Sequence, residues 1–251
     1  MIPFRTVTLR DKPWIDKIVL AEGSPSADYN FGNIYIWDER YRQLVARCGD
    51  RMLVKLRYEG VPSFVFPIGT GPLRPAVEAL REFAAHKGYA FCLRGITEPH
   101  RALLETEYPG SFVYAEDEDF ADYLYEAEKL ASYSGKALHG KRNHCNRFEA
   151  EHDWRFLPLT REWIPRCLDM LDVWTEENAG RLDKSIAFEH RAIIRAFAAY
   201  EELGLEGGIL LEGDEILGFT LGEPASRDTF DVHFEKARAD INGAYPMVNR
   251  E

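Results

Sequence analysis

The order of the expected helices and strands constrains the fold most, because the same order occurs twice along the chain. In the first half a helix starts near Asp11, and turn-bounded segments rich in β-forming residues follow at 41–47, 52–58 and 62–68. In the second half several helices precede a hairpin and a further strand within residues 209–234. Helices followed by antiparallel strands, twice over, predict an α+β fold of two similar units.

The two units are expected to meet near residues 116–133, with one domain spanning 1–125 and the other 126–251. A chain of 251 residues is long enough for two domains of ordinary size. The acidic run from Glu116 to Asp119 lies at the start of this junction. We expect that run to be a solvated connector.

The first unit contains aromatic residues that have two possible places in the fold. Tyr29, Phe31, Tyr35 and Trp37 either line a groove or fill the core, and their mixed spacing favours the core. The other elements expected in this unit include an amphipathic helix over 72–87, a strand over 89–94, a short helix over 99–107 and a strand over 112–115.

The composition is that of a folded globular protein, with 45% hydrophobic and 29% charged residues. No apolar run approaches the roughly 20 residues that a membrane-spanning helix needs, and the N-terminus lacks the pattern of a secretory signal. The four cysteines are widely spaced, without a Cys-x-x-Cys pair. Reduced thiols and a cytoplasmic location are therefore expected.

A basic segment interrupts an otherwise acidic chain. The formal net charge is −11, which argues against wrapping extended nucleic acid. Residues 136–147 nevertheless contain four basic side chains, two histidines and no carboxylate. The pattern predicts a helix over 134–152 with Leu138, Cys145 and Phe148 facing the core.

The basic face of this helix has two interpretations. Lys136, His139, Asn143 and Arg147 fall opposite the apolar stripe, and a solvated surface is the simpler interpretation. A cluster of one sign in a protein of the other sign also attracts phosphate or carboxylate groups. Arginine and lysine bind such anions through a bidentate fork and a point charge.

A metal site is not expected on the same helix. His139 and His144 are five residues apart, about 140° around a helix, so they do not face a common ion. No carboxylate follows His139 by three or four residues. Cys145 lies on the apolar face, which makes it a poor candidate nucleophile.

Two motifs carry a resemblance to a known family. "SGKALHGKRNHCNRF" and the later "DVHFEKARADINGAYPMVNRE" resemble the bacterial family related to the C-terminal catalytic domain of phosphatidylglycerol lysyltransferases. The family's pattern matches Gly135, Lys136, Lys141, Arg142, Asn143, Asn146 and Phe148 in the first motif, and His233, Glu235, Lys236, Ala237, Gly243 and Tyr245 in the second. The resemblance extends from residue 29 to the C-terminus.

This resemblance implies a tandem GNAT-like (acyl-CoA N-acyltransferase) fold, as in the peptidyltransferases that extend cell-wall cross-bridges. Characterised relatives transfer an aminoacyl group from aminoacyl-tRNA to a lipid hydroxyl or a peptide amine, and other members of the superfamily use acyl-coenzyme A. The chain lacks the membrane helices of the lipid-modifying relatives, so membrane anchoring is not implied. It ends at Glu251, so we expect the second unit to lack the family's last segment.

The resemblance also implies site residues. It assigns phosphate or substrate binding to Lys136, Lys141, Arg142, Asn143 and Lys236. It assigns catalysis to His233, Glu235 and Tyr245. Strand alternation predicts Asp231, His233 and Glu235 on one face, where the alternative is the wet side of a half-covered sheet. Tyr245 is expected either to donate a proton late in the reaction or to pack.

The loop that binds coenzyme A in other members is degenerate here. Its nearest equivalent runs from Arg238 to Ala244 and lacks the first glycine, while Asp240 adds a negative charge. The loop therefore favours a donor other than coenzyme A.

The leading functional prediction is an aminoacyltransferase without a bound cofactor, with aminoacyl-tRNA as donor and tRNA as partner. Its acceptor is a lipid, peptide or small molecule. The alternatives are an acyl-coenzyme A-dependent N-acyltransferase and a non-catalytic protein that retains only the ligand pocket.

Overall fold

A computed structural model describes residues 2–116, 121–178 and 184–251, so residues 117–119 of the acidic connector expected at 116–119 lie outside the described residues. The chain divides into two compact units. Met1–Asp122 and Ala225–Thr229 form the first unit, and Tyr123–Pro224 and Phe230–Glu251 form the second. Residues 225–229 thus group with the first unit, although they lie within the second half of the sequence.

The first unit is built on a mostly antiparallel sheet with the strand order β1-β2-β3-β4-β6, and β5 pairs with β3. Only the β4–β6 pairing among these strands is parallel. The strands are β1 (Arg5–Thr6), β2 (Leu44–Cys48), β3 (Arg51–Tyr58), β4 (Val61–Val65), β5 (Ile68–Gly69) and β6 (Leu93–Arg94). The helices are α1 (Lys12–Glu22), α2 (Phe31–Ile36), α3 (Asp38–Tyr41), α4 (Leu73–Lys87) and α5 (Glu98–Glu107).

The amphipathic helix expected over 72–87 is confirmed as α4. Its residues Leu80 and Phe83 are buried against Leu53 and Phe64 of the sheet. Gly88 then ends the helix with a φ of 69°, a left-handed conformation that glycine adopts without steric cost.

The prediction of a strand over residues 112–115 is wrong. No strand forms there, and Phe112 instead packs edge-on against Tyr108 with ring centroids 5.8 Å apart. The Arg81 guanidinium lies 5.0 Å from the centre of the Phe112 ring. Aromatic and cation–π packing on α4 and α5 therefore takes the place of strand pairing.

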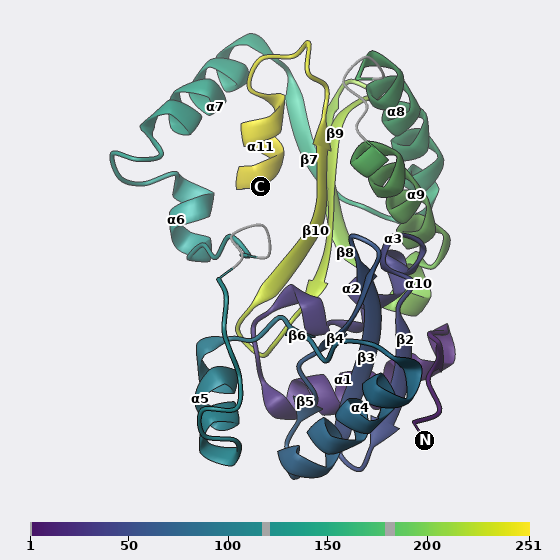
Figure 1. Ribbon diagram of the computed structural model, residues 1–251. Coiled ribbons are helices and arrows are strands. Elements are labelled where there is room, and N and C mark those ends of the chain that lie inside the picture. The colour runs from purple at the N-terminus through teal and green to yellow at the C-terminus, as the bar shows by residue number, and fades with distance from the viewer. Residues whose placement is uncertain (1, 117–120, 179–183) are drawn as a thin grey trace. The chain divides into compact units, whose positions relative to one another are not determined.

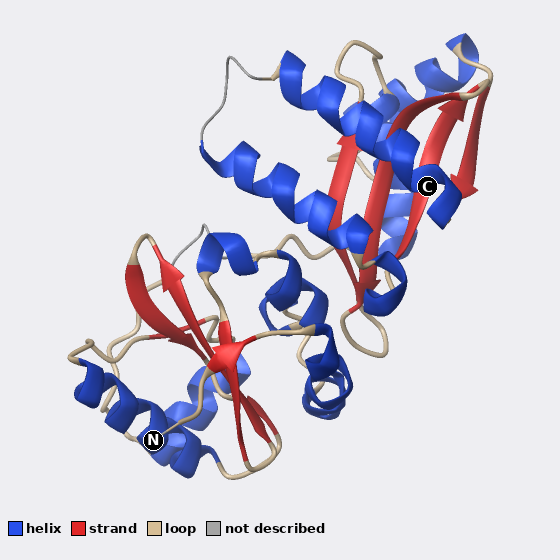
Figure 2. Cartoon of the chain, turned by 90° about the vertical axis from the view of Figure 1, so that its right-hand side faces the viewer, coloured by secondary structure: helices blue, strands red, loops and turns tan. Residues whose placement is uncertain are grey.

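The second unit is an antiparallel sheet with the strand order β10-β9-β8-β7. Helices α6, α7 and α11 lie on one face of this sheet, and α8 and α9 lie on the other (Figure 1; Figure 2 shows the unit from the side). The strands are β7 (Trp154–Pro158), β8 (Glu206–Glu212), β9 (Glu215–Pro224) and β10 (Phe230–Ala237). The helices are α6 (Ala127–Ser132), α7 (His139–Glu151), α8 (Ile164–Glu177), α9 (Lys184–Ala198), α10 (Tyr200–Leu203) and α11 (Ala244–Arg250).

The apolar stripe expected on the basic helix is confirmed. Cys145 and Phe148 are fully buried in a cluster with Leu210 and Met247, and Leu138 packs against this cluster. The helix itself begins later than expected, at His139. Gly135 has a φ of 88°, a left-handed conformation that a helix over 134–152 cannot contain, and Tyr133 just before it has a φ of 45°.

No helix within the described ranges is long and apolar enough to cross a bilayer.

Truncation of Phe148 tests the packing of α7 on the sheet. Phe148→Ala should lower the free energy of unfolding by about 3–5 kcal/mol, because a fully buried ring leaves a cavity. The neighbouring exposed residue gives a matched control, since Arg147→Ala should change the stability by only about 0.5 kcal/mol. Urea unfolding measures the free energy of unfolding of both variants. An equal loss of stability in the two variants would contradict this packing.

Candidate functional site

Strand β10 carries the candidate catalytic residues, and a β-bulge changes the direction of its side chains. Val232 pairs with Gly222 and Phe234 with Leu221, so His233 is the extra residue on β10. A bulge disrupts the regular ladder locally and reverses the alternation of faces beyond it. Bulges of this kind are frequent next to active sites.

The expectation that Asp231, His233 and Glu235 share one face is therefore wrong. Asp231 lies opposite Glu223 and Glu235 lies opposite Thr220, three residues away on the regular strand β9. Residues three apart on a strand point to opposite faces. The bulge at His233 thus separates the Asp231 carboxylate from the Glu235 carboxylate.

His233 lies between two carboxylates. Its side chain is 2% exposed, with Nε2 3.1 Å from Oε1 of Glu223 and Nδ1 3.3 Å from Oδ2 of Asp231. Both ring nitrogens thus face carboxylates of the protein itself, and the side chain is almost fully enclosed. This geometry fits a residue that holds the bulge in place better than it fits a general base.

Glu235 lies on the face covered by α11. The Asn249 side-chain amide of α11 donates to both carboxylate oxygens of Glu235, at 2.9 and 3.1 Å. Burial raises the pKa of Glu235, although the Asn249 hydrogen bonds and the nearby Lys141 charge act in the opposite direction. A partly buried carboxyl group with a raised pKa is suited to accepting a proton near neutral pH.

Asn249 connects this carboxylate to the basic helix. Its Oδ1 accepts a hydrogen bond from Nζ of Lys141 at 3.2 Å and lies 2.8 Å from the Tyr133 hydroxyl. Glu235 and Lys141, both expected in the site, therefore contact the same amide. We call Glu235, Asn249, Lys141 and Tyr133 the Glu235 cluster.

Arg142 supports this cluster through the backbone of Tyr133. Its Nη1 donates to the Tyr133 carbonyl oxygen at 2.6 Å and so holds the turn before α7. The side chain is only half-buried. One of the five N–H donors of Arg142 is thus used structurally.

Tyr245 lies next to the cluster, at the start of α11. Its ring is about half exposed, at 50%, and its hydroxyl is 3.4 Å from the Glu235 carbonyl oxygen, a weak contact. Burial, followed by the charges of Glu235 and Glu189, raises the pKa of Tyr245. The hydroxyl therefore keeps its proton at neutral pH, as a proton donor must.

The other expected residues lie away from the cluster. Lys236 is on the opposite face, with Nζ 2.9 Å from Oε1 of Glu189 and 4.2 Å from the centre of the Trp174 ring. Lys136 is exposed and precedes α7. Asn143 is also exposed, and its amide lies 3.3 Å from Nδ1 of His139.

The loop before α11 is held together by contacts within the protein. Arg238 forms ion pairs with Asp240, at 2.6 Å, and with Glu215. Gly243 has a φ of 94°, and a Cβ there would come within 2.7 Å of the His144 carbonyl oxygen on α7. This glycine is thus required for the close packing of the loop on α7.

No group of three or more His, Cys, Asp or Glu side chains in the described part of the chain could hold a metal ion.

Sequence reasoning missed Asn249 and Tyr133 as members of the site. Asn249 lies within the quoted motif "YPMVNRE", but a neutral amide does not stand out in a sequence as a charged or titratable residue does. Its role depends on the bulge and on α11, which bring residue 249 beside Glu235. Tyr133 lies just outside the quoted first motif, in the turn that Arg142 holds through the Tyr133 carbonyl oxygen.

The two units, each with a sheet flanked by helices, define a tandem GNAT-like α+β protein. The model of the family described as "Phosphatidylglycerol lysyltransferase, C-terminal" matches residues 22–251, and the chain belongs to this family. The resemblance inferred from the two motifs is thereby confirmed. Membership supports aminoacyl transfer as the general chemistry of the domain. No curated protein matches the chain.

Solved structures agree with this assignment. A conserved protein of unknown function from Bacteroides thetaiotaomicron VPI-5482 superposes with a TM-score of 0.93 and 35% identity, over 100% of this chain and 85% of that one. The C-terminal domain of a candidate lysylphosphatidylglycerol synthetase from Agrobacterium fabrum gives a TM-score of 0.55 and 12% identity, over 95% and 72% of the two chains. L-PGS from Bacillus licheniformis superposes with a TM-score of 0.57 and 16% identity, over 91% of this chain and 66% of that one. The last two similarities concern the fold alone.

The raised pKa of Glu235 predicts a pH-dependent stability difference. The folded protein binds the Glu235 proton more tightly than the unfolded chain does, so this group's stabilisation is present at low pH and is lost as the pH rises above about 4.5. Glu235→Gln should therefore gain stability relative to the wild type between pH ~4 and ~7. Urea unfolding across this range measures the difference.

The exposed residue Glu202 on α10 gives the control for this measurement. Glu202→Gln measures what the loss of an exposed carboxyl group does to the stability, and the Glu235→Gln difference is compared with it at each pH. A Glu235→Gln difference that does not change with pH would show that Glu235 titrates alike in the folded and unfolded states, contrary to its burial.

Proposed function

We propose that the second unit transfers an aminoacyl group from aminoacyl-tRNA to an amine or hydroxyl acceptor, with Glu235 as the proton acceptor. The observation that carries this proposal is the Glu235 cluster, in which one amide binds both a partly buried carboxylate and a lysine of the basic helix. A proton acceptor and a cation able to face phosphate thus belong to one arrangement. Family membership supports the same chemistry.

The reaction forms one acyl bond and breaks another. The acceptor nitrogen or oxygen attacks the ester carbonyl carbon, its proton passes to the Glu235 carboxylate, and the bond from that carbon to the ribose oxygen breaks. The departing ribose oxygen takes up a proton, and the Tyr245 hydroxyl beside the cluster is the group that we assign as its donor. The reaction needs no covalent enzyme intermediate.

His233 and Lys236 act as positioning residues in this proposal. Each is nearly buried, with side-chain exposures of 2% and 9%, and each pairs with a carboxylate. They anchor β10 on both sides of Glu235. Substitution of either residue should disturb the strand before it affects proton transfer directly.

The basic segment supports a nucleic acid donor. Lys136 and Lys141 are exposed, and α7 carries no acidic residue in its first turn. Lysines in such a position neutralise phosphates, and the resulting binding weakens steeply with salt. Arg142 contributes through the N–H groups that Tyr133 does not use.

The loop before α11 argues for aminoacyl-tRNA over coenzyme A. Arg238 is held by Asp240 and Glu215, and Gly243 packs against α7. The cation and the glycine that would contact a pyrophosphate are thus engaged within the protein. The acyl-coenzyme A alternative requires these contacts to break.

A transfer assay tests the proposal. Lysyl-tRNA carrying labelled lysine is incubated with the protein and either phosphatidylglycerol vesicles or a short peptide amine, since the family name gives lysine as the first choice. Label should pass to one acceptor, and Glu235→Gln should slow transfer by about 10²–10⁴-fold, the usual loss for a general base.

Binding of tRNA separates the donor site from the chemistry. Lys141→Ala should weaken tRNA retention and reduce its salt dependence, whereas Lys129→Ala, an exposed lysine of α6, should bind as the wild type does. Undiminished transfer by Glu235→Gln would overturn the role of this carboxylate. Turnover of acetyl-coenzyme A without transfer from lysyl-tRNA would replace the proposed donor.

A further inference from the structure

The first unit contains a cavity that the proposed reaction does not use. Its volume is about 400 Å³, within the range of small-molecule sites. Its lining comes from the aromatic segment before β2, from β3 and β4, and from the end of β6. Trp37, one of the aromatic residues first considered for a groove or the core, lines this cavity, whereas Tyr29 and Phe31 are core residues.

The Gln43 side chain is the most informative residue of this cavity. Gln43 is only 5% exposed and lines the cavity. The Gln43 side-chain amide forms no hydrogen bond with the described residues. The residue is nearly buried, yet its amide is not among the fully enclosed side-chain atoms without a partner, so the amide faces the space of the cavity. There it can pair with a ligand that has its own donor and acceptor.

Aromatic rings and guanidinium groups form one part of the wall. The Arg94 guanidinium lies 4.4 Å from the centre of the Tyr58 ring, and that of Arg40 lies 5.4 Å from the centre of the Tyr41 ring. Nε of Arg94 also donates to the Ser63 hydroxyl at 3.2 Å. Stacking of this kind holds each guanidinium in a defined orientation.

Carboxylates balance these cations. Asp28 and Asp122 also line the cavity, and Oδ2 of Asp122 accepts a hydrogen bond from the Ala27 amide at 3.3 Å. The lining thus carries two cationic and two anionic side chains. A ligand with both charges matches this lining better than an anion or a cation alone.

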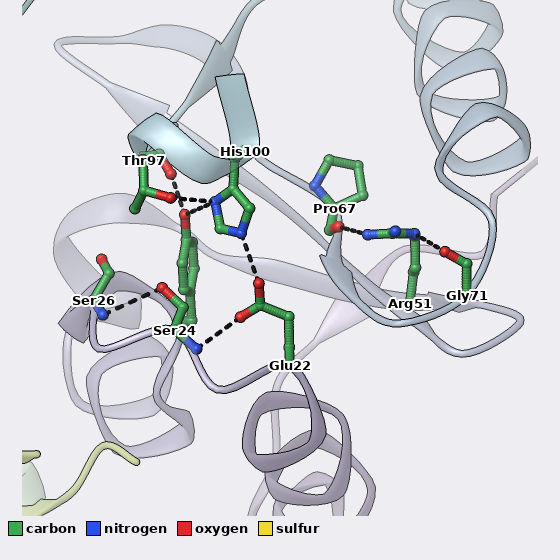
Figure 3. Close-up of polar contacts among 10 residues, drawn as sticks. Glu22, Ser24, Ser26, Arg51, Pro67, Gly71, Thr97 and His100 are labelled. Atoms are coloured by element: carbon green, nitrogen blue, oxygen red, sulfur yellow. Dashed lines mark hydrogen bonds and ion pairs between the residues drawn. The ribbon is translucent and has the colours of Figure 1, made fainter. Parts of the chain in front are cut away.

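A buried polar network stiffens the wall at Gly95, which also lines the cavity. The Tyr29 hydroxyl donates to the Gly95 carbonyl and lies 3.2 Å from Nδ1 of His100. His100 in turn contacts Glu22 at 2.7 Å (Figure 3). Gly95 has a φ of 63°, and a Cβ there would lie 3.1 Å from Oδ2 of Asp28, so glycine leaves room for this carboxylate.

We propose that the first unit binds a small zwitterionic molecule of about the size of a dipeptide. The carboxylate of the ligand faces Arg40 and Arg94, its ammonium group faces Asp28, and its amide pairs with Gln43. The aromatic rings contact an apolar side chain of the ligand. This site shares no residue with the Glu235 cluster.

Calorimetry with the full chain tests the proposal, with glycyl-L-phenylalanine as the probe. We expect binding in the micromolar to millimolar range. N-acetyl-glycyl-L-phenylalanine lacks the ammonium group and glycyl-L-phenylalaninamide lacks the carboxylate, so each should bind at least about 10-fold more weakly. Absence of binding by the dipeptide, or equal binding of all three probes, would overturn the proposal.

Substitution of Gln43 locates the binding. Gln43→Met keeps the volume of the side chain but removes its hydrogen-bonding groups, so the affinity for the dipeptide should fall by about 10-fold. The melting temperature should stay unchanged or rise, because the amide has no partner within the described structure. Asn178→Met, which removes an amide in the second unit, should bind as the wild type does.

A second variant keeps the test decisive if Gln43→Met fails to fold. Arg40→Met should weaken binding of the dipeptide but not of glycyl-L-phenylalaninamide, which has no carboxylate to lose. Wild-type affinity in both variants would refute a site in this cavity. The titrations contain no tRNA, so their outcome does not depend on whether the second unit transfers an aminoacyl group.

Discussion

The hydrogen bonds between Asn249 and Glu235 are the interaction on which the second unit's site depends. A carboxylate buried without partners would be costly, and the Asn249 amide meets both of its oxygens. The same Asn249 side chain accepts from Lys141 and lies beside the Tyr133 hydroxyl. One neutral residue thus joins β10, α11, α7 and the turn after α6.

The remaining charges of β10 serve mainly to fix this strand. His233 is held by Glu223 and Asp231, while Lys236 is held by Glu189 and the Trp174 ring. Buried ion pairs contribute little net stability, but removal of one partner leaves an uncompensated charge. Their effect is to define where the bulge occurs and which face Glu235 occupies.

The sequence predicted regular structure well and tertiary placement poorly. Helical periodicity placed Cys145 and Phe148 in the core, and turn signals located the hairpin of β8 and β9. A β-bulge has no comparable pattern, so the simple alternation expected for Asp231 and Glu235 was wrong.

Some functional features depend entirely on long-range packing. Asn249 gains its role from a contact with a residue 14 positions away across the loop before α11. Gln43 becomes a candidate ligand-binding residue only because folding places its side chain in the lining of a cavity. By contrast, the pair of motifs identified the family, because those residues are specified together by the packing of α7, β10 and α11.

The pH dependence of transfer tests the central claim most directly. If Glu235 accepts the proton, kcat/KM for transfer from lysyl-tRNA falls on the acidic side as Glu235 becomes protonated. Asn249→Leu removes hydrogen bonds that lower the pKa of Glu235, so the acidic limb should move to higher pH. An acidic limb at the same pH in the wild type and in Asn249→Leu would contradict the assignment of Glu235 as the proton acceptor.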